Sequence, residues 1–222
     1  RVGVEQMRNK VLLYIAVVFL VVFGIFSVVS NSGGEVRLDE VLIGWAESIS
    51  SPVFLSMMHL ISLIGSLENL LILTLLIAGV LMFKKDKFNS FFIIFLTISG
   101  LIFNLLLKFI FQRARPGDEV SYIEAFGHSF EIVSYSYPSG HTMRMTLFAL
   151  FLMYLGAIYL KKQSVIVINY ILFSLLIVLV GVSRVALGAH YPSDVLASIS
   201  ISISYFCISL YIGRKMIGTK DR

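Results

Sequence analysis

The chain has 222 residues, of which 58% are hydrophobic and only 14% are charged. A soluble domain carries about 25% charged residues, and a mean hydropathy of +0.91 leaves too little polar surface to coat a water-soluble globule. A soluble enzyme, a disordered chain and a coiled coil are therefore poor fits, and the composition indicates an integral membrane protein. One cysteine, Cys207, excludes an internal disulfide and a cysteine-rich metal site.

Six stretches are long enough to cross a hydrocarbon core, which requires roughly 17 to 25 helical residues. They lie at about 11–29, 67–83, 90–107, 142–160, 164–182 and 195–213. The first resembles the apolar region of a signal peptide, but its length and the lack of a small-residue cleavage site predict a helix that is retained.

Two segments depart from this simple pattern. Residues 36–65 are apolar but interrupted by Asp39, Glu40, Glu47 and Pro52, so we expect them to lie in the outer membrane interface. Residues 198–204 alternate serine and isoleucine, which in water would indicate a strand; in lipid an isolated strand leaves its backbone unpaired, so we expect a helix. The predicted fold class is all-α: a single domain over residues 1–222, built as a bundle of six transmembrane helices with an extracytoplasmic interfacial helical segment.

The net charge of +5 reflects topology rather than nucleic-acid binding. Both termini and the two short loops at 84–87 and 161–162 hold twelve of the eighteen lysines and arginines but only three acidic residues. The positive-inside rule therefore predicts a multi-pass protein of the cell membrane with both termini in the cytoplasm. We expect no nucleic-acid partner, and the oligomeric state stays open.

Ionisable residues otherwise gather at the outer ends of spans three to six, where they can converge. The first group is Lys108-x6-Arg115-Pro116, in which lysine offers a point charge and arginine a planar fork suited to phosphate oxygens. By itself this group also fits cations that snorkel at a membrane edge. It would be unusual there, because this face of the protein otherwise avoids positive charge.

Two further groups follow. Pro138-Ser139-Gly140-His141 precedes a predicted helix, whose free N–H groups would face an anion; the alternative is an ordinary capped helix start. In Ser183-Arg184-x5-His190-x3-Asp194 the histidine and the carboxylate are one helical turn apart. A carboxylate on one ring nitrogen fixes the tautomer and leaves the other nitrogen nucleophilic. A stabilising local pair at a helix start is the alternative reading.

Together the three groups are the signature of the type 2 phosphatidic acid phosphatase family, which the chain resembles over 108–194. Its membrane members are lipid phosphate phosphatases, and vanadium haloperoxidases share the site. The resemblance implies that Lys108, Arg115 and Arg184, with the backbone N–H groups of Ser139 and Gly140, bind the phosphate. It further implies that His190 attacks phosphorus, Asp194 orients it, and His141 protonates the leaving oxygen. No metal or other cofactor is expected.

The expected function is hydrolysis of a lipid phosphate or diphosphate at the extracytoplasmic face of the membrane through a phosphohistidine. Undecaprenyl diphosphate and phosphatidylglycerol phosphate are the favoured substrates, with phosphatidic acid or a broad lipid specificity as the alternative. Arg144 and Arg113 are further candidate substrate contacts; a local pair with Glu131 or Glu124 is the alternative for Arg144. From other classes, an anion or phospholipid transporter and a non-catalytic lipid-binding protein remain as rivals.

Overall fold

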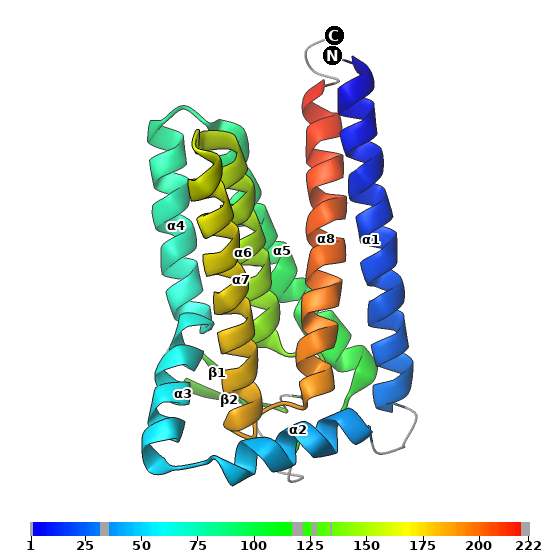
Figure 1. Cartoon of the computed structure of the whole chain (residues 1–222), viewed down its shortest axis with the longest axis vertical. Coiled ribbons are helices and arrows are strands. Elements are labelled where there is room, and N and C mark those ends of the chain that lie inside the picture. The colour runs from blue at the N-terminus through cyan, green and yellow to red at the C-terminus, as the bar shows by residue number, and fades with distance from the viewer. Residues whose placement is uncertain (1, 32–35, 117–121, 126–127, 134, 219–222) are drawn as a thin grey trace.

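The computed structural model of the chain describes residues 2–31, 36–116, 122–125, 128–133 and 135–218. Its helices are α1 (Val2–Asn31), α2 (Arg37–Ser48), α3 (Pro52–Ile64), α4 (Leu67–Phe83), α5 (Lys87–Phe111), α6 (Gly140–Tyr159), α7 (Gln163–Ala186) and α8 (Pro192–Gly218). Two antiparallel strands, β1 (Tyr122–Ala125) and β2 (His128–Val133), form a hairpin between α5 and α6. The long helices run side by side, with both chain ends at one end of the bundle (Figure 1).

The predicted membrane bundle is confirmed. Within the described residues, α1, α5, α6, α7 and α8 are each long and apolar enough to cross a membrane, and α3 and α4 form a bent pair that can count as the sixth span. The helix α4 coincides with the predicted span 67–83. The alternating segment at 198–204 is helical, as expected from the need to pair every backbone group in lipid.

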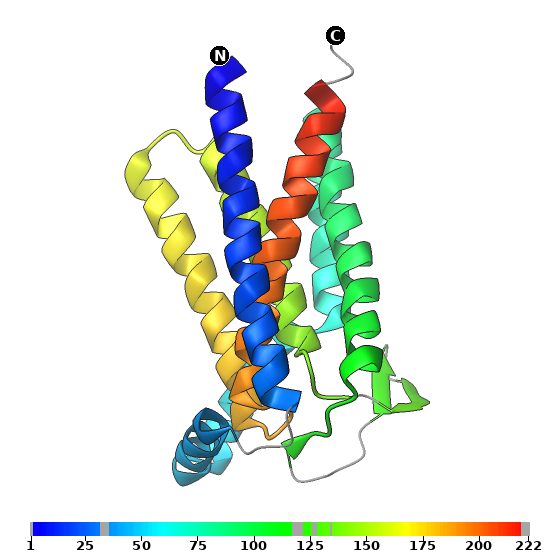
Figure 2. The ribbon, with the colours of Figure 1, turned by 90° about the vertical axis from the view of Figure 1, so that its right-hand side faces the viewer.

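The expected interfacial segment at 36–65 is divided in two. Only α2 runs across the end of the bundle away from the termini, whereas α3 continues into α4 with a bend of 41° (Figures 1 and 2). Asp39 and Ala46 on α2 are buried, and Val41 and Trp45 are exposed. A helix with one face against the protein and an exposed apolar face suits a membrane surface.

The bend between α3 and α4 depends on a glycine. A Cβ at Gly65 would lie 2.8 Å from Val180 Cγ1 and 3.3 Å from the carbonyl oxygen of His141. Only glycine therefore lets this corner approach α6 and α7 so closely. Serines before each helix cap them: Ser51 accepts from the Phe54 N–H and Ser66 from the Asn69 N–H.

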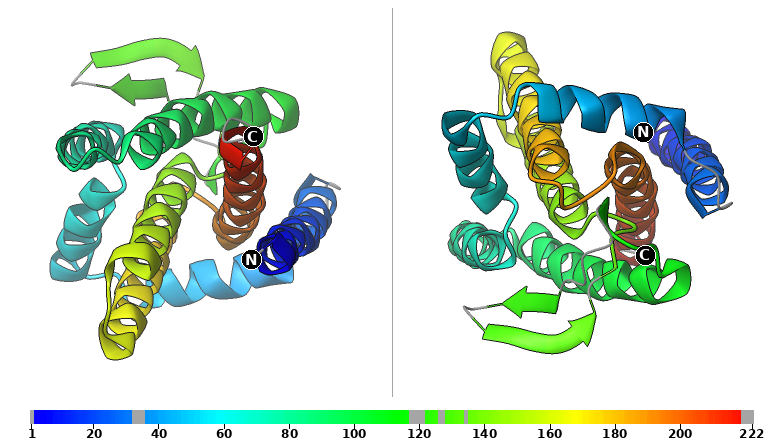
Figure 3. Two further views of the ribbon diagram at one scale, coloured as in Figure 1. Left: turned by 90° about the horizontal axis from the view of Figure 1, so that it is seen from above. Right: turned by 90° about the horizontal axis from the view of Figure 1, so that it is seen from below.

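The interior of the bundle is formed by α6 and α8. In the apolar stretch of each helix, 50% of the residues of α6 and 56% of those of α8 are buried inside the protein, against 11% for α1. Ser198 and Ser202 of α8 lie one turn apart, and each hydroxyl donates to the carbonyl oxygen four residues before it, at 2.7 and 2.6 Å. The same hydroxyls lie 3.0 and 3.4 Å from the carbonyl oxygens of Ser139 and Met143, so α8 packs closely against the start of α6. Views along the bundle show α6 surrounded by its neighbours (Figure 3).

Candidate active site

The three sequence groups meet at the end of the bundle that carries α2. Lys108 lies in the last turn of α5, Arg184 in the last turn of α7, His190 in the turn after it and Asp194 in the first turn of α8. Gly140 begins α6. Because helix ends from distant parts of the chain converge here, residues spread over 108–194 share one site.

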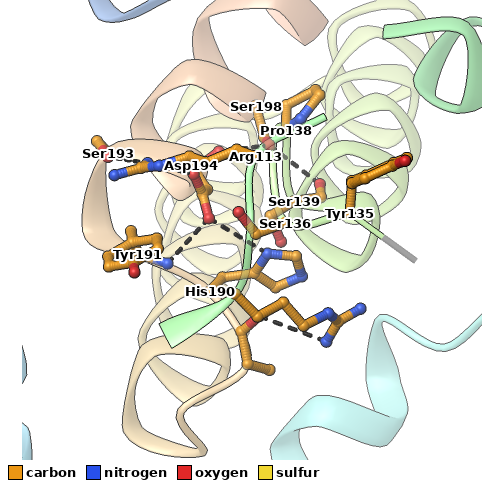
Figure 4. A network of polar contacts seen from close by, with 12 residues as sticks. Arg113, Tyr135, Ser136, Pro138, Ser139, His190, Tyr191, Ser193, Asp194 and Ser198 are labelled. Atoms are coloured by element: carbon orange, nitrogen blue, oxygen red, sulfur yellow. Dashed lines mark hydrogen bonds and ion pairs between the residues drawn. The ribbon is translucent and has the colours of Figure 1, made fainter. Parts of the chain in front are cut away.

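The histidine and the carboxylate of the third group face each other (Figure 4). Nδ1 of His190 lies 3.5 Å from Oδ2 of Asp194, which also accepts from the Tyr191 N–H at 2.9 Å. Both side chains are buried. The distance of 3.5 Å is long for a hydrogen bond, as catalytic contacts often are before substrate binds. The arrangement orients Nδ1 toward the carboxylate.

The environment of His190 keeps its ring neutral. Burial lowers the pKa of this histidine well below its ordinary value, and the positive charges of Lys108, Arg115 and Arg184 lower it further. A backbone contact with Ser136 acts in the opposite direction and does not reverse the shift. The three cations therefore lie close enough to His190 to act on its charge. An anion bound among them would relieve their mutual repulsion.

Each cation is held by a different neighbour. Lys108 Nζ donates to the carbonyl oxygen of Tyr135, and Arg115 Nη1 donates to that of Ala189 at 3.4 Å. Arg184 Nη1 donates to Ser62 Oγ of α3 at 2.5 Å, whereas its buried Nε has no hydrogen-bond partner within the described part of the chain. A buried, unpaired N–H on a guanidinium is costly unless a ligand accepts from it.

The start of α6 differs in detail from an ordinary helix cap. Ser139 occupies the N-cap position, but its hydroxyl lies 3.0 Å from Thr142 Oγ1 and does not cap a backbone N–H. The Ser139 N–H donates to the Asp194 carbonyl oxygen at 3.4 Å. A Cβ at Gly140 would lie 3.0 Å from Asn104 Oδ1 and 3.2 Å from Arg144 Nη1, so the glycine also permits close packing around this turn.

Arg144 lies beside this turn and borders an apolar cavity. Its Nη2 donates weakly to the Gly65 carbonyl oxygen at 3.4 Å, and its buried Nε has no hydrogen-bond partner among the described residues. Glu68 of α4 acts on it electrostatically; the side chains of Glu124 and Glu131 lie outside those described. The cavity is small, with a volume of about 10 Å³, and is lined by Arg144 and by apolar residues of α4, α5 and α6, including Leu70, Leu96 and Phe148.

Arg113 pairs with two carboxylates. Its Nη1 lies 2.6 Å from Asp194 Oδ1, and its Nη2 lies 2.9 Å from Asp39 Oδ2 on α2. No motif surrounds Asp39, so the sequence does not mark it as a site residue. Its one signal is its place, beside Glu40, in the first turn of α2.

A membrane bundle with three cations near a buried histidine that faces a carboxylate is the arrangement expected of an integral membrane phosphatase. The chain belongs to the PAP2 superfamily, which its residues 89–217 match, and it is a lipid phosphate phosphatase of that type.

Two relatives extend the match over most of the chain. Phosphatidylglycerophosphatase B of Bacillus subtilis is 27% identical over 198 residues, covering 87% of this chain and 92% of the relative. The crystal structure of a transmembrane PAP2-type phosphatidylglycerolphosphate phosphatase from Bacillus subtilis superposes with a TM-score of 0.77 at 25% identity. That superposition covers 91% of this chain and 97% of the solved one. The fold and the enzyme class are therefore those expected from the sequence.

Proposed function

We propose that the protein dephosphorylates a membrane lipid carrying two phosphate groups, through a phosphohistidine at His190. The observation that carries this proposal is a buried histidine whose Nδ1 faces Asp194 and on whose charge Lys108, Arg115 and Arg184 act. Preorganised cations stabilise the charge of a transferring phosphoryl group without further chemistry from the protein.

The proposed reaction has two steps. Nε2 of His190 attacks phosphorus, the bond from phosphorus to the lipid oxygen breaks, and His141 donates a proton to that leaving oxygen. Water then attacks the phosphohistidine, His141 accepts its proton, the phosphorus–nitrogen bond breaks and inorganic phosphate leaves. Asp194 holds Nδ1 throughout, and the backbone N–H group of Gly140 assists the cations once the phosphate is bound. The Ser139 N–H, expected from the sequence to bind phosphate as well, donates to the Asp194 carbonyl oxygen instead.

The test is phosphate release by detergent-purified protein in EDTA. Phosphatidylglycerol phosphate, undecaprenyl diphosphate and phosphatidic acid are assayed side by side in matched micelles. Faster release from phosphatidylglycerol phosphate or undecaprenyl diphosphate than from phosphatidic acid is the expected result, and the fastest substrate would identify the physiological class. Binding of all three lipids without any release would contradict the proposal and support a lipid-binding or transport role.

Arg144 supports a substrate with a second anionic group. Phosphatidylglycerol phosphate and undecaprenyl diphosphate each contain two phosphates, whereas phosphatidic acid contains one. Glu68, which acts on Arg144, lines a groove of about 260 Å³ between α4 and α5 with apolar residues such as Leu71 and Ile98. This groove suits a lipid chain that reaches the site laterally. The first phosphate would occupy the cations around His190 and the second would accept from Arg144. The name of the Bacillus subtilis relative favours phosphatidylglycerol phosphate among these lipids.

The variant Arg144→Leu is expected to lower kcat/KM for the two-phosphate lipids by about 10- to 100-fold, since a hydrogen bond to a charged group contributes about 1.5–3 kcal/mol. Its kcat/KM for phosphatidic acid should change much less. The matched control is Arg144→Lys, which keeps the charge and should keep part of the preference. An equal loss on all three lipids would show that Arg144 supports the helix start and not substrate choice.

The lowered pKa of His190 gives a pH prediction. The nucleophile must be neutral, and a pKa below the ordinary value of about 6.5 keeps it neutral as the pH falls through that value. The acidic limb of kcat/KM, which reports the free enzyme, should therefore lie below pH 6.5. The charged groups that face His190 are Lys108, Arg115, Arg184 and Asp194, with His141 nearby.

The measurement is kcat/KM between pH 4.5 and 8 in a constant-ionic-strength buffer. The substrate phosphate also titrates near pH 6, so its own titration is followed by phosphorus NMR in the same micelles and divided out. A corrected acidic limb at or above pH 6.5 would contradict a neutral, buried nucleophile.

We further propose that the site faces the extracytoplasmic side, with both termini in the cytoplasm. The basic residues of the α4–α5 and α6–α7 connections lie at the end of the bundle that carries the termini, opposite α2 (Figure 1). In intact cells a membrane-impermeant maleimide should label Glu47→Cys on α2 but label Lys162→Cys only after permeabilisation. The native Cys207 is buried and serves as the background. The reverse labelling pattern would invert the orientation.

A further inference from the structure

A buried network joins the interfacial helix α2 to the carboxylate that faces the nucleophile. Arg113, in the segment after α5, is its centre (Figure 4). One of its nitrogens, Nη1, contacts both Asp194 Oδ1 at 2.6 Å and Ser193 Oγ at 2.7 Å, and the other contacts Asp39 Oδ2 at 2.9 Å. Asp39 is only 4% exposed and Asp194 is fully buried. Both carboxylates are thus removed from solvent, whereas the Arg113 side chain keeps 14% of its surface exposed.

Asp39 also anchors the first turn of α8. Its Oδ1 accepts from the Ser193 N–H at 2.8 Å, and its Oδ2 accepts from the Ser193 hydroxyl at 2.6 Å. The N–H groups in the first turn of a helix have no partner within that helix, and a negative charge is favourable there. A side chain from α2 thus satisfies the end of the helix that carries Asp194.

One guanidinium faces two carboxylates in this network. Burial lowers the pKa of its guanidinium, but the carboxylates of Asp194 and Asp39 outweigh burial and raise it, so the group stays charged. The guanidinium also lies over the Tyr191 ring, 4.0 Å from its centroid. A buried carboxylate without a cation is costly, and Arg113 is the cation in direct contact with Asp194.

We propose that Arg113 and Asp39 are positioning residues for phosphoryl transfer. Arg113 holds Oδ1 of Asp194, so that Oδ2 is directed at Nδ1 of His190, and Asp39 fixes both Arg113 and the start of α8. This proposal rests on the proposed phosphohistidine function. It gives α2, which lies outside the matched residues 89–217, a part in the geometry of the reaction.

The test compares kcat, KM and thermal unfolding in four variants: Arg113→Gln, Arg113→Lys, Asp39→Asn and the double variant Asp39→Asn/Arg113→Gln. Glu47→Gln, an exposed carboxylate of the same helix, is the matched control. We expect kcat per folded protein to fall about 10²-fold in Arg113→Gln, since small misplacements of reacting groups have effects of this size. In Asp39→Asn we expect a fall of about tenfold, within the range known for residues that support a site indirectly.

The pattern of effects separates positioning from substrate binding. KM should stay nearly constant, because the cations that hold the phosphate are untouched. Lysine at 113 should restore only part of kcat, because one ammonium cannot replace the fork that reaches Asp194 and Asp39 together. The double variant should be no slower than Arg113→Gln alone, since the two residues act in series.

A second readout does not require turnover. In wild-type protein and in Glu47→Gln, the ¹⁵N shifts of the His190 ring should report the tautomer with the proton on Nδ1, whereas Arg113→Gln and Asp39→Asn should show a mixture. Unchanged kcat together with an unchanged tautomer in both variants would overturn the proposal. So would a raised KM with kcat preserved, which would make Arg113 a substrate contact. An inactive wild-type protein that still shows the tautomer change would refute the proposed function and leave the positioning role supported.

Discussion

Replacing His190 by alanine is expected to lower phosphate release by about 10⁴- to 10⁶-fold, the range for the loss of a nucleophile that acts with its partners as a unit. The fall follows from the geometry: Nδ1 is directed at Asp194, and no other described histidine has a carboxylate in this position. The direct measurement is a rapid-quench experiment with substrate labelled at the reacting phosphate. Wild-type protein should retain label that is stable in alkali and lost in acid, as a phosphohistidine is, and His190→Ala should retain none.

The control for this experiment is His59→Ala, which removes an exposed histidine of α3. It should leave both turnover and trapped label unchanged. Phosphate release that persists at the wild-type rate in His190→Ala would show that another group attacks phosphorus, and the assigned mechanism would then be wrong.

Replacing Arg184 should produce the second large effect. Arg184→Gln is expected to lower kcat/KM by about 10²- to 10³-fold, the typical loss for one preorganised donor to a developing charge. Arg184→Lys should recover little of this, because a point charge cannot reproduce the planar fork. The guanidinium is already buried with an unpaired Nε, and Ser62 fixes its Nη1, so its position needs no rearrangement when phosphate arrives.

Thermal unfolding distinguishes a loss of catalysis in Arg184→Gln from a loss of folded protein. Arg184 is buried and is repelled by Arg115, so Arg184→Gln should unfold at the same temperature as wild type or higher. Ser62→Ala, which removes only the support of the guanidinium, should have a smaller kinetic effect than Arg184→Gln. A melting temperature that falls in parallel with activity would instead mean that Arg184 holds the helices together.

Much of this architecture could be predicted because the membrane restricts the choices. The predicted spans at 142–160 and 164–182 differ from α6 and α7 by only a few residues, since an apolar run in lipid must be helical to pair its backbone. The alternating serines and isoleucines of α8 could be assigned to a helix for the same reason, because lipid offers no partner to the backbone of an isolated strand. The three motifs could be placed at one end of the bundle because alternate helix ends face the same side.

The contacts that support the site could not be predicted, because they join residues with no shared pattern. Arg113 and Asp39 are 74 positions apart, and Glu68, on a different helix from Arg144, acts on it electrostatically. The hairpin of β1 and β2 could not be predicted either. Its short strands lie between two membrane spans, where the hydropathy pattern indicates only a connection. The bend at Gly65 depends on space taken by Val180 of a different helix.

The weakly buried helix α1 has a consequence for how the protein is made. Near its outer end, Ser27 Oγ lies 2.7 Å from the Tyr137 hydroxyl, and Phe23 stacks on the Tyr137 ring at 5.9 Å. Tyr137 directly precedes the Pro138-Ser139-Gly140 turn that opens α6. Proteolytic trimming of α1 during biogenesis would strip this tyrosine of its hydroxyl partner and of the Phe23 ring. An α1 that stays attached after membrane insertion therefore supports the turn that opens α6.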